Sequence, residues 1–357
     1  MITNVRLVGF KAFKDKSISL GKLTVLAGLN NSGKSSFMQA VRMSVAGQNS
    51  ESPYIDGLGG FSALKSSFTA PGEPILIELN LSDSTTTKLE LKETGFEFQG
   101  GDGAPFTQFI SADRYGPRVQ LPIMREDAAA LTVGIHGEFS AYYASVLENI
   151  IVAEPLRHPN SASATLKHQL SHWMGEISPG VKLNFEVERK YDSSYTAIDD
   201  LRPTNSGFGI SYVLPIVLCI LTMSGSMGDD DSDWRVKEWF ALLNSQKSLL
   251  LIENPEAHLH PRGQTVLGRL ITIAAASGIQ TIVETHSDHV LDGIRLATKH
   301  DPGVTPTDVQ IKYFKKSSAT ETDVSEIKVL DDGRLDHWPE GFFDQMSVNL
   351  RALSSKK

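Results

Sequence analysis

The chain has 357 residues, and 34 Lys and Arg residues against 42 Asp and Glu residues give it a formal net charge of −8. At roughly 100–200 residues per domain, this length allows two or three domains, and a chain of this size needs no metal or disulfide to bury a core. A surface that coats nucleic acid nonspecifically is usually basic, so the acidic balance does not indicate one, although contact with DNA stays open.

The single cysteine, Cys219, excludes an intramolecular disulfide and suits a reducing compartment. It lies in an apolar stretch, where a buried thiol is expected rather than a nucleophile. Residues 1–10 lack the long apolar core of a signal peptide. The longest apolar run, Ile210–Met223, contains Pro215 and is shorter than the about 20 residues that span a bilayer. We therefore expect a soluble, cytoplasmic protein.

The first third of the chain predicts strands around one glycine-bounded loop. Ile2–Phe10 and Lys22–Ala27 have the β-branched and apolar composition of strands, and Ser36–Val45 carries apolar residues at helical spacing. The period-two patterns of Pro74–Leu81 and Lys88–Phe98 predict strands at the edge of a sheet.

After a short strand at Phe109–Ile110 the pattern changes. Within residues 127–200 we expect helices at Phe139–Val152 and Thr165–Ile177 and a strand at Lys182–Arg189. These residues predict a mainly helical insertion between an N-terminal lobe, residues 1–126, and a C-terminal lobe, residues 201–357.

The C-terminal lobe carries the pattern of a parallel α/β sheet. Ser248–Ile252 and Gln280–Val283 are continuous apolar runs, which are typical of buried parallel strands, and Pro261–Ala276 between them predicts a helix. Ser224–Asp233 is polar and acidic and predicts a surface loop. The expected fold class is therefore α/β.

Residues 28–35 (GLNNSGKS) match the phosphate-loop pattern G-x-x-x-x-G-K-[ST] in full, between a predicted strand and a predicted helix. In such a loop the backbone N–H groups surround phosphates, Lys34 reaches the β and γ phosphates, and Ser35 can ligate Mg²⁺. The absence of an N/T-K-x-D segment after a strand favours ATP over GTP. The residues predicted to contact the nucleotide here are Gly28, Asn30, Asn31, Ser32, Gly33, Lys34, Ser35 and Ser36.

A phosphate loop requires a second strand that brings a carboxylate to the metal ion, and Ser248–Glu253 is the apolar run ending in an acid that fits. The stretch after it, Asn254–Pro261 (NPEAHLHP), resembles the D-E-P-E-x-H-L-H-P segment of ABC-class ATPases of the RecF, SMC-head and OLD (overcoming lysogenization defect) type. Three other stretches also resemble segments of this class: the N-terminal Ile2–Phe13, Ser111–Arg118 and Asn205–Ser211 (NSGFGIS). The last of these is a divergent form of the ABC signature segment. Together these motifs cover about residues 2–45 and 200–296, and the part of the chain between these ranges is covered poorly apart from Ser111–Arg118.

The resemblance implies a P-loop NTPase of ABC type, with a mixed or parallel core sheet and an antiparallel β subdomain. It implies that two subunits enclose two ATP molecules, so that ATP binding forms a homodimer and hydrolysis separates it. His286 occupies the position of the switch histidine that senses the γ-phosphate, and Glu253 that of an Mg²⁺-orienting acid. The residues implied to contact the partner's nucleotide are Ser206, Gly207, Gly209 and Ser211.

Two positions depart from the family pattern, because Glu253-Asn254 stands where Asp-Glu is usual. An amide does not accept a proton near neutral pH, so Asn254 cannot serve as the base. Glu256 is the nearest carboxylate that could polarise water. Alternatively, Glu256 is a structural acid, and the protein is a slow hydrolase or a nucleotide-locked switch.

Three functions stay open. The first is an ABC-class ATPase whose two subunits enclose two ATP molecules and form an ATP-driven homodimer. The second is a DNA-processing, OLD-like nuclease, against which stand the short stretch after Leu296 and the turn-like Asp331–Arg334 in place of a D-x-D motif. The third is a partner module, in which this chain is the sensor or motor for a separate effector protein, and the resemblance connects this role with anti-phage systems. SMC-like chromosome work is disfavoured because long heptad-repeat arms are missing.

Several other residues carry open interpretations. A turn is expected at His258 and His260, which argues against metal ligation, and Asp288 is expected to cap a helix. Arg114 is expected either to contact nucleotide or the insertion or to form a surface ion pair. Leu335–Phe343 is rich in aromatic residues and predicts a packed turn or a docking surface.

Overall fold

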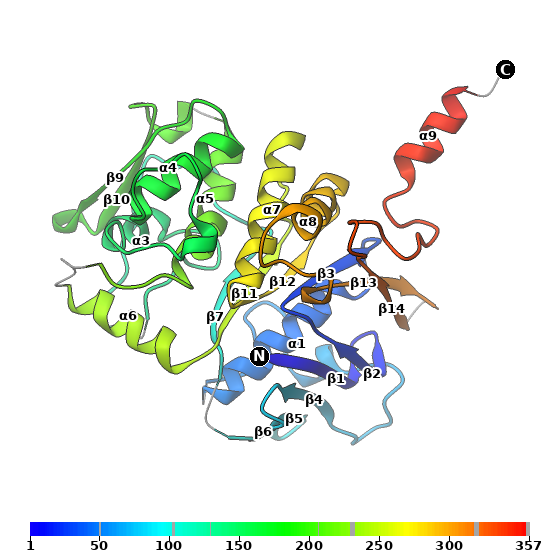
Figure 1. Cartoon of the computed structure of the whole chain (residues 1–357). Coiled ribbons are helices and arrows are strands. Elements are labelled where there is room, and N and C mark those ends of the chain that lie inside the picture. The colour runs from blue at the N-terminus through cyan, green and yellow to red at the C-terminus, as the bar shows by residue number, and fades with distance from the viewer. Residues whose placement is uncertain are drawn as a thin grey trace. The chain divides into compact units, whose positions relative to one another are not determined.

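The computed structural model describes residues 1–354 except 50, 102–103, 129, 206, 229–232 and 318–320, and it also leaves out the side chain of Ser347. The chain divides into two compact units. Unit 1 combines Met1–Pro105 with Pro306–Lys357, and unit 2 is Phe106–Thr305. The two ends of the chain therefore belong to the same unit, and Figure 1 shows blue N-terminal strands beside orange strands from the C-terminal part of the chain.

Unit 1 contains an antiparallel sheet with the strand order β2-β1-β4-β5-β6. The predicted strand Lys88–Phe98 is two strands, because the chain turns at Glu93-Thr94. The expected edge position of Pro74–Leu81 is wrong, since β4 lies between β1 and β5. The strands are β1 (Ile2–Phe10), β2 (Phe13–Ser19), β4 (Ile75–Leu81), β5 (Thr86–Lys92) and β6 (Gly95–Gln99).

A second group of strands in unit 1 positions the phosphate loop. In β3 (Leu23–Gly28) five successive residues are buried, and β3 runs parallel to β13 (Val309–Lys316). β14 (Thr322–Lys328) pairs antiparallel with β13. After the loop, α1 (Lys34–Gln48) packs against β4 and β5, so the predicted order of strand, loop and helix is confirmed.

Unit 1 also contains α2 (Phe61–Leu64) and the C-terminal α9 (Gln345–Ser354). Between β14 and α9, Phe342 is buried and lies edge to face against Tyr313 with ring centroids 5.5 Å apart. The packed-turn interpretation of this aromatic segment therefore holds for Phe342.

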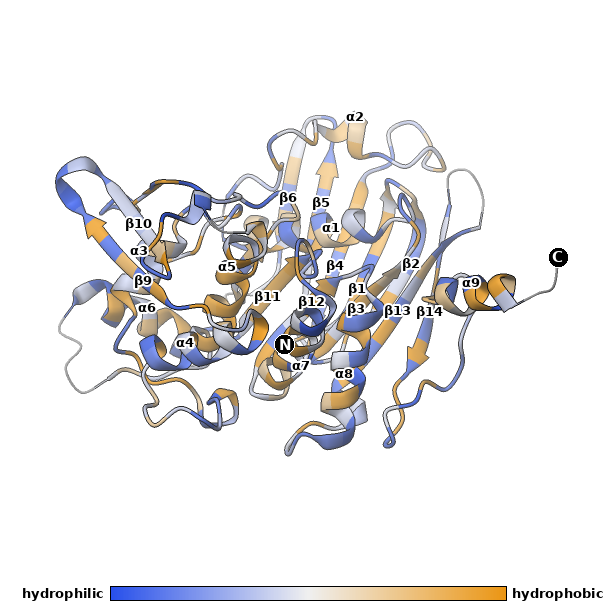
Figure 2. Cartoon of the chain, turned by 90° about the horizontal axis from the view of Figure 1, so that it is seen from above, coloured by the Kyte–Doolittle hydropathy of each residue, from blue (hydrophilic) through white to orange (hydrophobic). Residues whose placement is uncertain are grey.

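Unit 2 contains the predicted parallel strands. β11 (Ser248–Glu253) pairs in parallel with both β12 (Ile279–Glu284) and β7 (Phe106–Ile110). Figure 2 shows the hydrophobic colouring of β11, which is buried up to its last residue. Because the strands are parallel, their carboxyl ends meet at one edge of the sheet.

The helices that follow these strands are α7 (Pro261–Ala276) and α8 (Asp288–His300). The bounds of α7 are those predicted. The expected cap of α8 is wrong, because Ser287, and not Asp288, is the N-cap residue: its Oγ accepts the Val290 N–H at 3.0 Å.

The remainder of unit 2 mixes helices with an antiparallel sheet of order β8-β10-β9. The helix predicted over residues 139–152 ends at Val146. Beyond it, backbone groups bond elsewhere: the carbonyl of Ile150 accepts the Leu166 N–H, and Ile151 pairs with Ser226. The elements are β8 (Leu121–Pro122), β9 (Leu183–Glu188), β10 (Ser193–Ile198), α3 (Ser140–Val146), α4 (Leu166–Ile177), α5 (Phe208–Thr222), α6 (Trp234–Ser245) and the 3₁₀ turn η1 (Glu154–Leu156).

The apolar helix α5 is buried from Val213 to Thr222 and accommodates Pro215. Its Cys219 is fully buried, and burial raises the pKa of the thiol, so the prediction of an inert cysteine agrees with its surroundings. Within the described residues, no helix has the length and apolar character needed to traverse a bilayer.

Candidate active site

The phosphate loop of unit 1 depends on backbone conformations that favour glycine. Gly28 and Gly33 have φ of 136° and 101°, and Asn31 between them has φ of 60°. A Cβ atom at Gly28 would lie 2.2 Å from the carbonyl oxygen of Phe314 on β13. No residue with a side chain fits there without a shift of the strand, so β3 and β13 approach each other closely where the loop begins.

Lys34 is buried at the start of α1, with 2% of its surface exposed. Its Nζ donates hydrogen bonds to the carbonyl oxygens of Gly28 and Leu29, both at 2.9 Å. The loop thus folds around an ammonium group at the N-terminal end of a helix, where the backbone N–H groups also favour an anion.

Ser32 is buried, and its Oγ has no hydrogen-bond partner among the described residues. Its carbonyl oxygen accepts the Thr322 hydroxyl at 2.9 Å, which ties the loop to β14. The side chains of Asn30, Asn31 and Ser35 are exposed. An orphaned buried hydroxyl, a buried ammonium and an accessible serine in the first turn of α1 fit a triphosphate with its metal ion.

The carboxyl ends of β11 and β12 position the acids of unit 2. Glu253 lies opposite Glu284 in the register of the two strands, and its Oε2 accepts the Ala112 N–H at 3.1 Å. The Asn254 N–H donates to the carbonyl of Glu284 at 2.9 Å, which keeps the chain beside β12 as it leaves the strand.

Arg114 is the residue whose role sequence reasoning missed. It is buried, with 2% exposed, so the surface ion pair weighed for it is wrong. Its Nη1 donates to the carbonyl oxygens of Ser111 and Glu253 at 2.8 and 2.7 Å, and its Nη2 donates to that of Asn254 at 2.6 Å. Burial lowers its pKa to about 10, so the guanidinium stays charged near neutral pH. Its place after β7, in the S-A-x-R-x-G-P segment, was the available signal.

Glu256 accepts one hydrogen bond on each carboxylate oxygen. The Thr285 hydroxyl donates to Oε2 and the His286 N–H donates to Oε1, both at 2.7 Å. Each oxygen keeps a further lone pair, so the carboxylate is held in place without being saturated. The His286 ring is 37% exposed, and its Nε2 lies 3.9 Å from a carboxylate oxygen of Glu284. The structure therefore brings Glu253, Glu256 and His286 together in unit 2.

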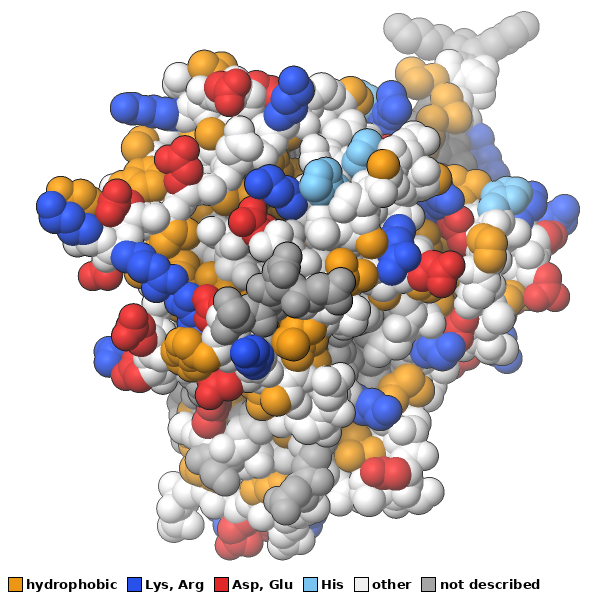
Figure 3. Space-filling model, turned by 60° about the vertical axis from the view of Figure 1, so that its left-hand side comes forward, with side chains coloured by type: hydrophobic (Ala, Val, Ile, Leu, Met, Phe, Trp, Pro, Cys, Tyr) orange, Lys and Arg blue, Asp and Glu red, His pale blue; other side chains and the backbone are white. Residues whose placement is uncertain are grey.

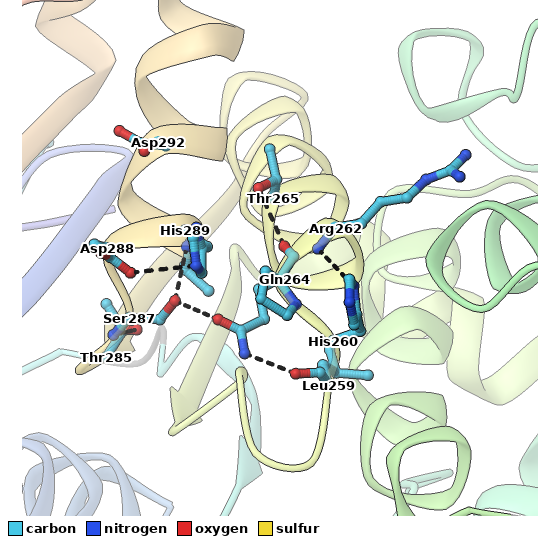
Figure 4. A network of polar contacts seen from close by, with 12 residues as sticks. Leu259, His260, Arg262, Gln264, Thr265, Thr285, Ser287, Asp288, His289 and Asp292 are labelled. Atoms are coloured by element: carbon cyan, nitrogen blue, oxygen red, sulfur yellow. Dashed lines mark hydrogen bonds and ion pairs between the residues drawn. The ribbon is translucent and has the colours of Figure 1, made fainter.

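The segment between Glu256 and α7 is fixed by side-chain contacts. The His260 ring caps α7 by accepting the Arg262 N–H at 3.3 Å. Gln264 donates to the carbonyl of Leu259 at 2.8 Å and accepts the Ser287 hydroxyl at 2.5 Å. Figure 4 shows Gln264 between these two partners, joining the start of α7 to the cap of α8.

The signature-like segment begins α5. Ser206 lies outside the described residues, and Gly207 is the N-cap residue, where an added Cβ would meet nothing within 4 Å. A Cβ at Gly209 would lie 2.6 Å from the carbonyl oxygen of His258. Ser211 is partly exposed in the first turn of the helix.

Aromatic contacts fix the same segment. The His258 ring packs against Tyr212 and Phe208, with centroids 4.5 and 5.4 Å apart, and the Arg114 guanidinium lies 5.3 Å from the Tyr212 ring. The signature-like segment therefore packs beside the turn that carries Glu256. This contact was not predicted from the sequence.

A family model of the AAA ATPase domain matches residues 1–93 and 160–291, which is more than half of the chain. Residues 304–353 match a family described as a protein of unknown function (DUF3696). No curated protein matches the chain in sequence.

Solved structures of similar fold include an SMC head bound to the C-winged helix domain of ScpA. It is 14% identical, with a TM-score of 0.51 over 92% of this chain and 98% of that one. An SMC head domain from Thermotoga maritima is 13% identical, with a TM-score of 0.47 over 91% and 98%. The recombination mediator RecF is 13% identical, with a TM-score of 0.45 over 90% and 98%.

Proposed function

The chain belongs to the AAA ATPase domain family, with a fold similar to that of an SMC head, and we propose that it binds and hydrolyses ATP as an ABC-type ATPase. The buried Lys34 ammonium, enclosed by a glycine-dependent loop at the start of α1, is the observation that carries this proposal. Residues 28–36 would contact the phosphates. Ser35 and Glu253 would hold Mg²⁺, which supplies charge neutralisation during phosphoryl transfer.

In this proposal Glu256 accepts a proton from the attacking water, and His286 senses the γ-phosphate. The two hydrogen bonds to the Glu256 carboxylate support this role, because a base must be held in one orientation to contribute. They also fit the alternative of a structural acid in a slow, nucleotide-locked switch, so turnover must be measured.

We further propose an ATP-dependent homodimer, in which Ser206, Gly207, Gly209 and Ser211 complete the partner's nucleotide site. The open space beside Gly207 and the 54% exposure of Phe208 support a free surface at the start of α5. A separate effector protein would read the nucleotide state, as in anti-phage systems. One SMC head is bound to a domain of ScpA, which illustrates such a partner.

Binding of DNA is the alternative for this partner surface. Figure 3 shows one face of the molecule, on which positive and negative side chains are interspersed, and this pattern does not favour a nonspecific nucleic-acid surface on that face. An OLD-like nuclease would carry a D-x-D motif after a strand. The Asp331–Arg334 segment, weighed for this motif, is a turn, in which the Leu330 N–H donates to the carbonyl of Arg334 at 2.7 Å.

ATP turnover by the purified chain tests the proposal. Lys34→Ala should abolish turnover and weaken ATP binding by about 1.5–3 kcal/mol, the value of a charge-assisted hydrogen bond. Lys14→Ala, which removes an exposed lysine of the same unit, is the matched control and should leave both unchanged. ATP affinity and turnover of wild-type size in the Lys34 variant would refute the phosphate-loop assignment.

A further inference from the structure

Unit 2 contains a cavity of about 720 Å³ that the proposed ATPase activity does not use. Its walls come from η1 and the residues after it, from α4, from α7 and from the residues that follow α8. Pockets for small molecules are typically about 300–1,000 Å³, so this one has the size for a ligand such as a mononucleotide.

Three of the charged groups that line the cavity already have partners. Arg269 forms a two-pronged ion pair with Asp301, at 2.7 and 2.5 Å. Glu176 lies 2.8 Å from the Nε2 atom of the buried His158. The His158 Nδ1 accepts the Asn160 N–H at 3.2 Å, so the ring proton lies on Nε2 and is donated to Glu176.

Two further arginines line the same cavity without a carboxylate partner among the described residues. Arg157 donates its Nε to the carbonyl oxygen of Val152 at 2.9 Å, which orients the guanidinium. Arg262 lies in the first turn of α7, and Figure 4 shows its side chain extending away from Gln264. With Arg269 they outnumber the two acids of the cavity, which therefore has a formal positive charge.

The other walls suit a ligand with an apolar part. The cavity is lined by Pro155, Pro159, Pro302 and Ile273, and by Trp173, whose indole N–H is already donated to the Leu156 carbonyl. A planar guanidinium matches phosphate oxygens with two parallel hydrogen bonds. The guanidinium groups of Arg157 and Arg262, neither of which is paired with an acid among the described residues of the cavity, offer more N–H donors than a single carboxylate ligand could accept.

We propose that this cavity binds a phosphate-bearing small molecule about the size of a mononucleotide, at a site made of residues other than the phosphate loop. Arg157 and Arg262 bind its phosphate, and the proline and isoleucine side chains contact the rest. The inference does not depend on ATP hydrolysis, because none of its residues belongs to the proposed catalytic set.

Hydrogen exchange of the full chain, titrated with inorganic pyrophosphate, tests the site by location. Peptides from residues 155–176 and 262–273 should become protected in the wild type. The variant Arg157→Ala/Arg262→Ala should need on the order of a hundredfold more pyrophosphate, about tenfold for each lost charge-assisted contact. The control Arg125→Ala/Arg351→Ala removes two exposed arginines from other places and should respond as the wild type does.

Protection of residues 28–36 is read in the same experiment and reports the phosphate loop separately. If pyrophosphate protects residues 155–176 and 262–273 but does not protect residues 28–36, the result counts against the proposed ATP site and leaves this inference standing. No protection at 155–176 with millimolar pyrophosphate, or unchanged protection in the double alanine variant, would overturn the inference. Equal protection by succinate would also overturn it, because the site would then be a carboxylate site. If the alanine pair does not fold, Arg157→Lys/Arg262→Lys replaces it, with about a tenfold loss expected from the missing paired hydrogen bonds.

Discussion

Arg114 binds the backbone of Glu253 and not its carboxylate: Nη1 of the arginine lies 2.7 Å from the carbonyl oxygen of the glutamate. With the bond from Nη2 to the Asn254 carbonyl, one buried guanidinium fixes the two residues at which β11 becomes the acid-bearing turn. Arg114 is therefore a positioning residue for this turn.

Arg114→Ala should lower the free energy of unfolding by about 2–5 kcal/mol, because three partly buried carbonyl oxygens each lose a charged donor. Urea unfolding measures this change. Arg118→Ala, which removes an exposed arginine four residues later, is the control and should change stability by less than about 0.5 kcal/mol. Equal stability of the two variants would show that water replaces the guanidinium without cost.

Gly28→Ala should destabilise the chain and reduce ATP binding, because the new Cβ would lie 2.2 Å from the Phe314 carbonyl oxygen. Gly57→Ala is a matched control: Gly57 also has positive φ, at 81°, but nothing lies within 4 Å of an added Cβ. The control should cost about 1–2 kcal/mol from backbone strain alone, and the Gly28 variant should cost more. Thermal unfolding and ATP titration of both variants compare the two effects, and equal costs would contradict the close approach of β13.

Glu256→Gln should reduce ATP turnover by about 10²–10⁴-fold if Glu256 is the base. It should also trap an ATP-bound dimer, which mass measurement in ATP would detect. Glu238→Gln, an exposed acid on α6, serves as the control for the loss of one charge. Turnover near that of the wild type would assign Glu256 to a structural role, since its hydrogen bonds to Thr285 and His286 fit either role.

Gly207→Asp should leave ATP binding by the monomer intact and abolish ATP-driven dimerisation. A carboxylate about 4 Å from a γ-phosphate charge would be repelled by roughly 4 kcal/mol at an effective dielectric constant near 20. The substitution itself should fold, because an added Cβ meets nothing within 4 Å. Mixing this variant with Lys34→Ala should restore part of the turnover, since a heterodimer contains one intact site. Normal dimerisation of the Asp variant would mean that the segment is only the start of a helix.

The sequence predicted those parts of the fold that local pattern determines. Continuous apolar runs located β3, β11 and β12, and helical spacing after Pro261 gave the bounds of α7. The helix over residues 139–152 was predicted too long, because the carbonyl of Ile150 bonds to Leu166 on another element, and periodicity does not report such distant partners.

In the candidate site, too, the sequence located the residues that belong to a local pattern and missed those that depend on distant partners. The phosphate-loop motif located Lys34, and the acid at the end of an apolar run located Glu253. Arg114 could not be placed, because its acceptors are backbone carbonyls and carry no residue-type signal. The contact between Gly209 and the His258 carbonyl likewise joins segments far apart in the sequence.

The parallel pairing of β3 with β13 has a consequence for synthesis of the chain on the ribosome. β3 begins at Leu23, but its partner begins at Val309, and the loop after β3 also bonds to Thr322. At roughly 5–20 residues per second, the nascent β3 waits on the order of tens of seconds for these partners. The phosphate loop therefore acquires its native shape only after residues 309–322 have been made, so chains that end before β13 should not bind nucleotide.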